Sequence, residues 1–512
     1  VLNLRDPSRV TAVIPTATTV NYKGRTLVAV PHGLDEVRVL RNLGLDAPAP
    51  IEHYYDWPGR FTPYLHQKIT ASFLTTNPRA YCLNGMGSGK TVSVLWAFDY
   101  LKKLGLVKRM LVVGPLSSME RAWADEVFRH FPHLNCAVLY GTRERRHKLL
   151  AQDFDIFIIN HDGAKNKETM RLLAEREGLD VIVVDEIDTA RNASTDMWKA
   201  LNVIINGNKK GDLKRKEWVW GLTGTPVPNY PTDAWAQCKL VTPGTVSPYF
   251  GGFRDRVMRQ ITQFKWVPRD NAMEVIHEVM QPAVRFARED CIDLPPTTYQ
   301  TVQVELTDEQ RKAYDEMLRQ LKTECEGGTI KAINEAVKLN KLLQICLGTA
   351  YSEDGYVSIP ARPRVELVRE LIHRAEGKVL VFAPLTGALL ALAEELRKDF
   401  SVEVVYGDVP KAKRDQIFQD FQTSPHPRVI VANPKTMSHS LTLTEANTII
   451  WYGPTHSNGT YEQANARVTR PGQKRNTLIV NIEATAIERR VFQVLRDRGQ
   501  MQGLLLDMVR DA

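Results

Sequence analysis

The stretch AYCLNGMGSGKTVSVLWAFDYL, residues 80–101, places a short apolar run before a glycine-rich turn and an amphipathic run after it. Glycines in such a turn let successive backbone N–H groups curl around phosphate oxygens, and the start of the next helix adds the positive end of its dipole. We interpret residues 85–91 as a P-loop of the type G-x-x-x-x-G-K-T. Lys90 is expected to neutralise the β- and γ-phosphates, and the Thr91 hydroxyl to ligate Mg²⁺. The residues expected to bind a nucleoside triphosphate are Gly85, Gly87, Ser88, Gly89, Lys90 and Thr91.

An acidic cluster follows an apolar run in GLDVIVVDEIDTARN, residues 178–192. Residues 181–184 indicate a buried strand, and Asp185 and Glu186 stand where it ends. At the carboxyl end of a strand beside a P-loop, Asp185 can reach Mg²⁺ and Glu186 can polarise the attacking water. Acid clusters after strands also serve as helix caps, so this interpretation depends on the P-loop that precedes it.

The composition is that of a globular protein with several domains: 512 residues, 43% hydrophobic and 25% charged. Such a length exceeds one hydrophobic core and predicts roughly two to four domains. The chain has no apolar run of about 18 residues, and VLNLRDPSRV at its start lacks the apolar segment of a secretory signal. The six cysteines form no C-x-x-C pair, which favours a reducing cytosol over a zinc site or a disulfide framework. The net charge of +8 permits a polyanionic partner without proving one.

The order of further motifs makes the chain resemble the Swi/Snf-related ATPases of helicase superfamily two, which run on duplex DNA. Residues 61–74 resemble the Q-motif region, and the resemblance implies that Gln67 reads the adenine edge and selects ATP. It also implies that residues 223–225 of motif III link the nucleotide state to the DNA path. The other matching stretches are LVVGPLSSMERAWADEV (111–127, motif Ia), GLTGTPVPN (221–229, motif III), KVLVFAPL (378–385, motif IV), VVYGDVPKAKRDQIFQDFQ (404–422, motif IVa) and YEQANARVTRPGQKR (461–475, motif VI).

Arg467 and Arg470 of motif VI are the arginine fingers that the resemblance implies. Taken alone, their stretch would be a solvated basic helix end. Their spacing predicts that both side chains face the same way, one helical turn apart, before a Pro-Gly pair ends the helix. In motors of this family the second lobe closes over ATP held by the first, so both arginines would approach the γ-phosphate bound by Lys90. The planar guanidinium fork suits phosphate oxygens as the transition state spreads their charge, and hydrolysis would then depend on closure.

Motif V departs from the family pattern, which usually reads G-x-G-L-N-L. Ser438 and Ser440 occupy the glycine-like positions, and Thr442 stands where asparagine is common. Serine can keep the turn and add a hydroxyl, or it can weaken the coupling between nucleotide and DNA. Since every group needed for hydrolysis is present, we expect a functional variant.

Contacts with DNA phosphates are expected at strand ends in motifs Ia, III, IVa and V, as the resemblance implies. Backbone amides and hydroxyls grip phosphates without reading bases, so binding should be independent of sequence and sensitive to salt. Two basic stretches, residues 141–150 and 206–218, either touch DNA or are solvated charge runs. The candidate DNA contacts are Ser117, Asn160, His161 and Ser440.

The expected fold class is α/β, with two RecA-like parallel-sheet lobes, a helical insertion and a small N-terminal α+β module. Residues 1–57 form that module and a proline-punctuated linker, and an alternating run with a Lys-Gly turn predicts a hairpin followed by a short helix. The module is either a DNA-binding accessory or a structural cap on lobe 1. Lobe 1 is expected at residues 58–290. Residues 291–512 would hold the helical protrusion (305–345), lobe 2 and a terminal brace helix.

Together these features predict a DNA-dependent ATPase that uses ATP and Mg²⁺ to translocate along double-stranded DNA. Its expected task is to remodel forks or branched DNA, or to displace bound proteins, in repair or replication. We expect a monomer without a membrane partner, in a bacterial or phage-infected host cytoplasm and associated with the nucleoid. The alternatives are an RNA helicase, a polypeptide-pushing ATPase and a catalytically weak DNA-binding relative. Thr-Gly-Thr-Pro in motif III disfavours the first alternative, and the complete set of catalytic residues disfavours the last.

Overall fold

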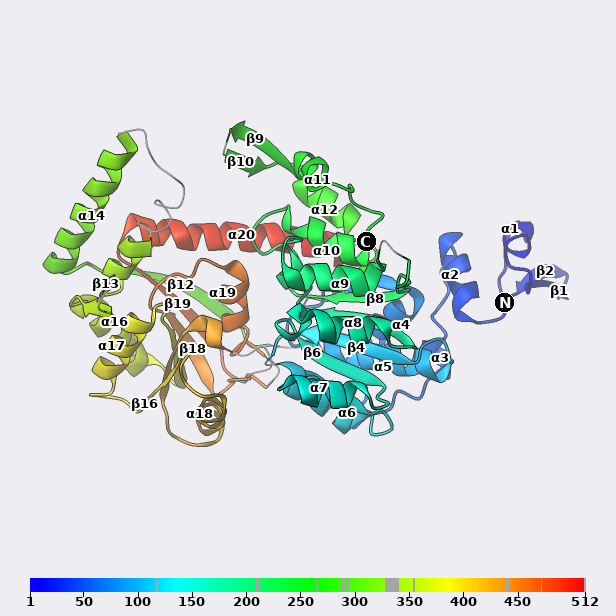
Figure 1. Cartoon of the computed structure of the whole chain (residues 1–512), viewed down its shortest axis with the longest axis horizontal. Coiled ribbons are helices and arrows are strands. Elements are labelled where there is room, and N and C mark those ends of the chain that lie inside the picture. The colour runs from blue at the N-terminus through cyan, green and yellow to red at the C-terminus, as the bar shows by residue number, and fades with distance from the viewer. Residues whose placement is uncertain are drawn as a thin grey trace. The chain divides into compact units, whose positions relative to one another are not determined.

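The structure is a computed structural model that divides the chain into two compact units, which we call lobe 1 and lobe 2 (Figure 1). Lobe 1 comprises Val1–Cys291 together with Leu504–Ala512, and lobe 2 comprises Ile292–Gly503. The residues that the structure describes are 1–116, 118–208, 211–263, 265–287, 291, 294–326, 340–352, 355–437, 442–470 and 472–510.

Lobe 1 is built on one parallel sheet. Its described strands are β3 (Arg79–Cys82), β4 (Arg109–Gly114), β5 (Cys136–Val138), β6 (Ile156–Asn160), β7 (Leu179–Asp185), β8 (Trp218–Leu222) and β11 (Ala283–Val284). They lie in the order β11-β3-β8-β7-β4-β6-β5, and every neighbouring pair is parallel. The central strands are apolar on both faces, as a parallel sheet covered on both sides requires. The carboxyl ends of β3, β8, β7, β4 and β6 share one edge, which we call the site edge.

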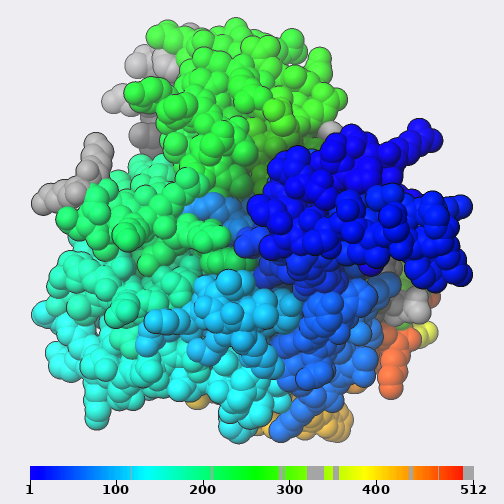
Figure 2. Space-filling model, turned by 90° about the vertical axis from the view of Figure 1, so that its right-hand side faces the viewer, coloured from blue at the N-terminus to red at the C-terminus, as the bar shows by residue number. Residues whose placement is uncertain are grey.

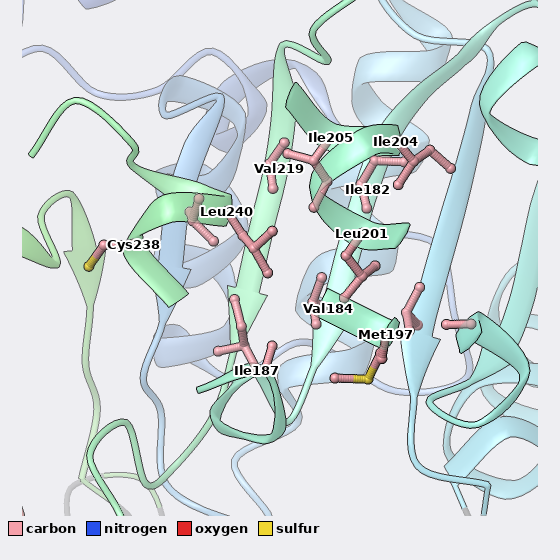
Figure 3. Packing of buried hydrophobic residues seen from close by; sticks show 14 of the residues in the cluster. Ile182, Val184, Ile187, Met197, Leu201, Ile204, Ile205, Val219, Cys238 and Leu240 are labelled. Carbon is pink, nitrogen blue, oxygen red and sulfur yellow. The ribbon is translucent and has the colours of Figure 1, made fainter. Parts of the chain in front are cut away.

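Helices cover both faces of this sheet (Figure 1). Those of lobe 1 are α4 (Leu65–Thr76), α5 (Lys90–Lys103), η1 (Met119–Ala124), α6 (Asp125–His130), α7 (Arg143–Leu150), η2 (Gly163–Lys165), α8 (Lys167–Glu175), η3 (Ile187–Ala190), α9 (Asp196–Asn206), α10 (Asp233–Val241), α11 (Phe250–Val257) and α12 (Ala272–Val279). On one face α9 packs Leu201 and Ile204, which its helical period brings to one side, into a buried cluster with Val184 of β7 (Figure 3). On the other face α5 belongs to a second cluster, which includes Trp96 and Trp123.

The N-terminal module stands at the surface of lobe 1, in dark blue in Figure 2. It consists of α1 (Ser8–Thr11), β1 (Thr18–Tyr22), β2 (Arg25–Ala29), α2 (Leu34–Asn42) and α3 (Ile51–Tyr54), so the expected hairpin and helix are confirmed. Val10, Val28 and Val37 belong to a small core of its own. Arg38 of α2 donates to the carbonyls of Thr75 and Thr76 at 3.3 and 3.2 Å, which attaches the module to the end of α4. These contacts agree with a structural cap, and the alternative of a DNA-binding accessory stays open for the exposed hairpin.

One hairpin of lobe 1 was not predicted. Strands β9 (Met258–Thr262) and β10 (Lys265–Pro268) pair antiparallel and extend from the end of α11 (Figure 1). Its base is held by Arg254, whose guanidinium lies 3.9 Å from the ring centroid of Trp266, and by Arg269, which donates to the carbonyl of Met258 at 3.1 Å. On β9 only Met258 is buried, so the strand has no alternation of apolar and polar residues that would reveal it.

Lobe 2 is also built on a parallel sheet. Its described strands are β12 (Thr297–Gln303), β15 (Lys378–Phe382), β16 (Val402–Val405), β17 (Val429–Ala432), β18 (Ala446–Trp451) and β19 (Thr477–Glu483). Their order is β12-β19-β18-β15-β17-β16, again parallel throughout. A separate hairpin pairs β13 (Thr349–Ser352) with β14 (Gly355–Ser358). The α/β class with two parallel-sheet lobes is therefore confirmed.

The helices of lobe 2 include the predicted insertion and the predicted terminal helix. They are α14 (Asp308–Glu326), α16 (Arg362–Arg374), α17 (Thr386–Leu396), α18 (Lys411–Thr423), η4 (Pro434–Thr436) and α19 (Asn458–Asn465). The terminal helix α20 (Ala486–Arg510) begins in lobe 2 and continues past Gly503, where lobe 2 ends. Helix α14 falls within the expected protrusion, of which residues 327–339 lie outside the described part. The bracing role of α20 stays a prediction. In the part of the chain that the structure describes, no helix is both long and apolar enough to cross a membrane.

Candidate functional site

The glycine-rich loop joins β3 to α5 at the site edge. Gly87 and Gly89 have φ angles of 81° and 80°, a backbone conformation that favours glycine. Lys90 begins α5, and its Nζ donates to the carbonyls of Asn84 and Gly85 at 3.0 and 3.3 Å. The loop thus holds the ammonium group through its own carbonyls, next to the N-terminal end of the helix.

Helix α4 brings Gln67 and His66 against this loop. Gln67 accepts from the Tyr64 N–H at 3.1 Å, within a capping box, and donates to the Ser88 carbonyl at 3.3 Å. The Nε2 of His66 lies 2.9 Å from the same carbonyl. A Cβ at position 89 would lie 2.2 Å from the Gln67 amide nitrogen, so Gly89 is needed for this close approach as well as for its φ. Gln67 therefore contacts the loop directly, and its reading of the adenine edge stays a prediction.

One part of the P-loop prediction is wrong. In the pattern G-x-x-x-x-G-K-T the first glycine stands five residues before Gly89, and that position is Asn84. The buried side chain of Asn84 donates to the Thr70 hydroxyl at 2.8 Å and accepts from the Phe286 N–H at 2.9 Å. The Gly85 N–H donates to the Phe286 carbonyl at 2.9 Å. Asn84 and Gly85 thus attach the start of the loop to α4 and to the residues after β11.

Asp185 ends β7, and Glu186 follows it with φ 52° and ψ 57°. This left-handed conformation is costly for a residue other than glycine, and such strain is found most often at functional sites. The Asp185 carboxylate accepts from the indole N–H of Trp123 at 3.0 Å, and the Asp185 carbonyl lies 3.0 Å from Nε2 of His161. The structure thus holds Asp185 by both its side chain and its backbone at the site edge.

Motif III lies between the acidic turn and the glycine loop, because β8 separates β7 from β3. The Thr223 hydroxyl donates to the Asp188 carboxylate at 3.0 Å. A Cβ on Gly224 would lie 3.6 Å from Cγ of Met86 and 3.7 Å from the carbonyl oxygen of Asn84. Motif III therefore contacts the acidic turn on one side and the glycine loop on the other, and three motifs far apart in sequence meet at one edge.

Polar groups of the loop suit a phosphate ligand. Ser88 is 2% exposed, and its hydroxyl has no hydrogen-bond partner within the described residues. Burying a hydroxyl without a partner costs free energy, so a ligand that bonds to it would be stabilised there. At the end of β3, burial raises the pKa of the Cys82 thiol to about 11, so at neutral pH this cysteine is a neutral core residue and not a reactive thiolate.

The predicted metal ligands have suitable chemistry for Mg²⁺. Thr91 and Asp185 offer oxygen atoms, the ligands that this hard cation prefers. Within the described residues no group of three or more His, Cys, Asp or Glu side chains could form a metal cluster. Mg²⁺ at nucleotide sites is usually held by one or two protein oxygens together with substrate phosphates and water, so the two residues fit such a site.

The candidate DNA contacts fall into two groups. Ser117 and Ser440 lie outside the described residues, as does Ser438 of motif V, whereas Asn160 and His161 stand at the end of β6. Asn160 is buried and accepts from the N–H of the residue three positions later at 3.1 Å, and the His161 ring binds the backbone of the acidic turn. Both side chains thus serve the lobe itself, and their contact with DNA stays a prediction.

The two arginines of motif VI follow α19 in lobe 2. The helix ends at Asn465, so the prediction that one helix carries both arginines as far as the Pro-Gly pair is wrong. After Asn465 the backbone N–H groups of Arg467 and Val468 donate three residues back and that of Arg470 only two, so the regular α-helical bonding is lost. Arg467 is 1% exposed, whereas Arg470 is partly exposed and donates to the hydroxyl of Thr442 at 3.2 Å. Thr442, the motif V residue that departs from the family pattern, therefore holds Arg470. The role of the two arginines as fingers stays a prediction.

Trp123 is the site contact that sequence reasoning missed. Its partner Asp185 is 62 residues away, and a tryptophan within an apolar stretch is usually read as core. The only indication in the sequence that Trp123 belongs to the site was its place in motif Ia, which lies between the P-loop and the acidic cluster.

The comparison with protein families agrees with this geometry. Residues 81–349, a little more than half of the chain, match the family described as the SNF2-related domain. The chain belongs to the SNF2-related family. Residues 363–472 match the helicase conserved C-terminal domain, which includes both arginines of motif VI. The family resemblance is thereby confirmed, and the protein is an ATPase of the helicase class.

Individual relatives of this SNF2-related protein are distant but span most of the chain. Protein p41 of Acyrthosiphon pisum secondary endosymbiont phage 1 is 24% identical over 88% of this chain and 98% of its own length. "Uncharacterized ATP-dependent helicase MG018" of Mycoplasma genitalium is 22% identical over 81% of this chain and 39% of its own length. Among solved structures, the Sulfolobus solfataricus SWI2/SNF2 ATPase core in complex with dsDNA is 24% identical, covers 88% of this chain and 94% of its own, and has a TM-score of 0.42. The chain thus spans nearly all of the phage relative and less than half of the mycoplasma relative.

Proposed function

We propose that this protein is an ATP-dependent motor that translocates along double-stranded DNA without reading its sequence. The observation that carries the proposal is the meeting of the glycine loop, motif III and the acidic turn at one edge of a parallel sheet. Open α/β sheets bind their ligands at this edge. The mycoplasma relative is named an ATP-dependent helicase, and a net charge of +8 suits a polyanionic partner.

Lobe 1 would bind and orient ATP. Lys90 would direct its charge to the β- and γ-phosphates, together with the N-terminal end of α5. Thr91 and Asp185 are the residues that would hold Mg²⁺, which when bound neutralises charge on the phosphates. Glu186 would orient the attacking water and accept its proton. Arg467 and Arg470 of lobe 2 would add charge at the γ-phosphate, as the family resemblance implies, so that hydrolysis depends on lobe closure.

The proposal extends to the DNA substrate of the motor and to its cellular setting. We propose that it acts as a monomer in a bacterial or phage-infected cytoplasm, on forks or branched DNA, or on proteins bound to DNA. The 98% coverage of a phage protein favours that setting. Gel assays with a fork, a four-way junction and a linear duplex would separate these tasks, because only a remodelling motor changes the first two in the presence of ATP.

The nature of the track is tested by steady-state ATPase rates with duplex DNA, single-stranded DNA, RNA and unfolded polypeptide. Duplex DNA of any sequence should raise the rate, and the stimulation should fade with salt, because each neutralised phosphate contributes about 0.9 to the slope of log affinity against log salt. Lys90→Ala should abolish turnover with every track and thereby exclude contaminating ATPases. Stimulation by RNA or by polypeptide alone would contradict the DNA translocase.

A further inference from the structure

The segment that follows β4 packs directly on Asp185. Val113 pairs with Val184, so Gly114 at the end of β4 stands beside Asp185 at the end of β7. A Cβ on Gly114 would lie 3.1 Å from Cβ of Asp185 and 3.3 Å from the hydroxyl of Ser118, so a side chain there would crowd both residues. The start of motif Ia and the predicted Mg²⁺ ligand are therefore in contact.

Trp123 adds a polar contact to this packing. Its side chain is 0% exposed, and its Nε1 donates to Oδ2 of Asp185 at 3.0 Å. It belongs to η1, a π-helix. Short π-helical segments are rare in proteins, and those that occur are often found at functional sites. An indole N–H can only donate, so it stabilises the ionised carboxylate, which is the form that ligates a metal.

We propose that Trp123 is a positioning residue for Asp185, and that through it the motif Ia segment controls Mg²⁺ binding at the nucleotide site. Trp123 is buried, so it acts only through the carboxylate that it orients. The link to DNA rests on the proposed function, in which motif Ia contacts the track and DNA steadies this segment. The contact between Trp123 and Asp185 does not depend on that function.

The alternative is a core tryptophan whose N–H merely needs an acceptor. Trp96 offers the comparison: it is 0% exposed, lies in the same buried cluster and donates its indole N–H to the Pro58 carbonyl at 2.7 Å. The substitutions Trp123→Phe and Trp96→Phe therefore each remove one indole N–H from similar surroundings. Only Trp123→Phe takes the hydrogen bond from a predicted site residue, Asp185.

The test measures Mg²⁺-dependent binding of a fluorescent ATP analogue in a Glu186→Gln background, where ATP is not turned over. Trp123→Phe should raise the Mg²⁺ concentration for half-maximal binding by about tenfold or more, because partners of metal ligands contribute about 10–100-fold to metal affinity. Trp96→Phe should leave it unchanged, and binding without Mg²⁺ should be equal in both. With Glu186 intact, Trp123→Phe should also reduce the stimulation of the ATPase by duplex DNA while DNA affinity stays the same.

Equal Mg²⁺ dependence of the two phenylalanine variants would overturn the proposal. A second measurement needs no folded variant: in the unsubstituted chain, the indole ¹⁵N–¹H resonance of Trp123 should shift when Mg²⁺ and ADP are added, and that of Trp96 should not. Absence of this shift would also overturn it. If the unsubstituted chain were not stimulated by duplex DNA, the translocase would be contradicted, and the Mg²⁺ measurement would still decide the role of Trp123.

Discussion

In lobe 1 the buried carboxylate of Asp99 has two half-exposed partners, whereas in lobe 2 that of Glu488 pairs with a cation that is itself buried. Asp99, on α5, accepts from the Tyr55 hydroxyl at 2.6 Å and lies 2.7 Å from Nε2 of His133 and 3.0 Å from Nζ of Lys103. The side chains of His133 and Lys103 are 43% and 51% exposed. This cluster fastens the linker of the N-terminal module to the helix that follows the P-loop.

Glu488, on α20, is held in a different way. Its carboxylate accepts two hydrogen bonds from Arg364 of α16, at 2.7 and 2.8 Å, and the two side chains are 0% and 2% exposed. Arg364 also donates to the carbonyl of Ile482 at 3.4 Å. The pair thus fastens α20 to the sheet and to α16 within lobe 2.

The difference lies in what can replace a lost partner. Around Asp99, the half-exposed side chains of Lys103 and His133 remain when one donor is lost. Burial raises the pKa of the Tyr55 hydroxyl well above its usual range, so that it remains a donor at every pH of interest. Around Glu488 no water can replace Arg364 without entering the core, and a buried charge without its partner is strongly destabilising. The exposure of the partners should therefore decide how much each carboxylate cluster contributes to stability.

The largest effect is expected if Arg470 of lobe 2 is an arginine finger. Arg470→Ala should lower the ATPase rate at saturating DNA and ATP by about 10³-fold or more, the range of arginine fingers in phosphoryl transfer. ATP affinity should fall only slightly, because Lys90, Thr91 and Gln67 remain in lobe 1. Arg470→Lys should not restore the rate, since a point charge lacks the planar fork. Steady-state ATPase and DNA-binding assays measure both.

The matched control for Arg470 is Arg475→Ala, in the same segment. Arg475 donates to the backbone carbonyl of Glu445 and is partly exposed, so its loss should leave turnover close to that of the unsubstituted chain. Near-normal turnover of Arg470→Ala would contradict the finger role, and Arg470 would then be only part of a solvated basic turn.

The next effect concerns the buried pair of lobe 2. Arg364→Ala should lower the free energy of unfolding of lobe 2 by about 3–5 kcal/mol, because Glu488 is left charged and buried. Arg364→Met with Glu488→Leu should recover most of this loss, since apolar residues of similar size often replace such pairs. Chemical denaturation followed by a lobe 2 signal measures both variants. The exposed Arg374 on the same helix, 74% exposed, is the control, and its loss should change stability by less than about 0.5 kcal/mol.

A smaller effect is expected for the fastening in lobe 1. Tyr55→Phe removes one donor from Asp99 and should cost about 1–2 kcal/mol, because two partners remain. Tyr54→Phe, next in the chain and 63% exposed, should cost almost nothing. A loss for Tyr55→Phe as large as that for Arg364→Ala would show that the exposure of the partners does not explain the difference between the lobes.

The smallest effect is expected from substitutions in the hairpin of the N-terminal module, and it tests whether this module contacts DNA. Every residue of β1 is exposed, Lys23 lies over the Tyr22 ring, and residues 16–33 contain no acidic side chain. If this hairpin contacts DNA phosphates, Lys23→Ala with Arg25→Ala should reduce the salt slope of DNA affinity by about 2, at unchanged maximal ATPase rate. Arg374→Ala with Lys398→Ala removes the same charge from lobe 2 and should not change the slope. An unchanged slope for the hairpin variant would leave the module as a structural cap only.

Local features of both lobes were predictable from the sequence. The apolar runs of β3 and β7, the glycine loop and the Lys-Gly hairpin turn all appear where they were expected. Each depends on residues within a few positions of one another, where backbone geometry and the alternation of apolar side chains act directly. The run after the glycine loop is a helix as expected, but it is buried on all sides from Val92 to Leu101 and not amphipathic. The end of α19 before Arg467 and the hairpin β9–β10 were not predicted. Strand β9 is exposed except for Met258, so no alternation of apolar and polar residues reveals it.

The sequence by itself determined which chemical groups are present and in what order: a glycine-rich loop, an acidic turn, and arginines that a family pattern assigns to the γ-phosphate. Only the tertiary structure decided which of these groups touch. It placed Trp123 on Asp185, turned His161 toward the acidic turn and joined Arg364 to Glu488 across 124 residues. Hydrogen-bond partners must come within about 3 Å. Whether two distant residues do so depends on how the sheet orders its strands, which no local spacing encodes.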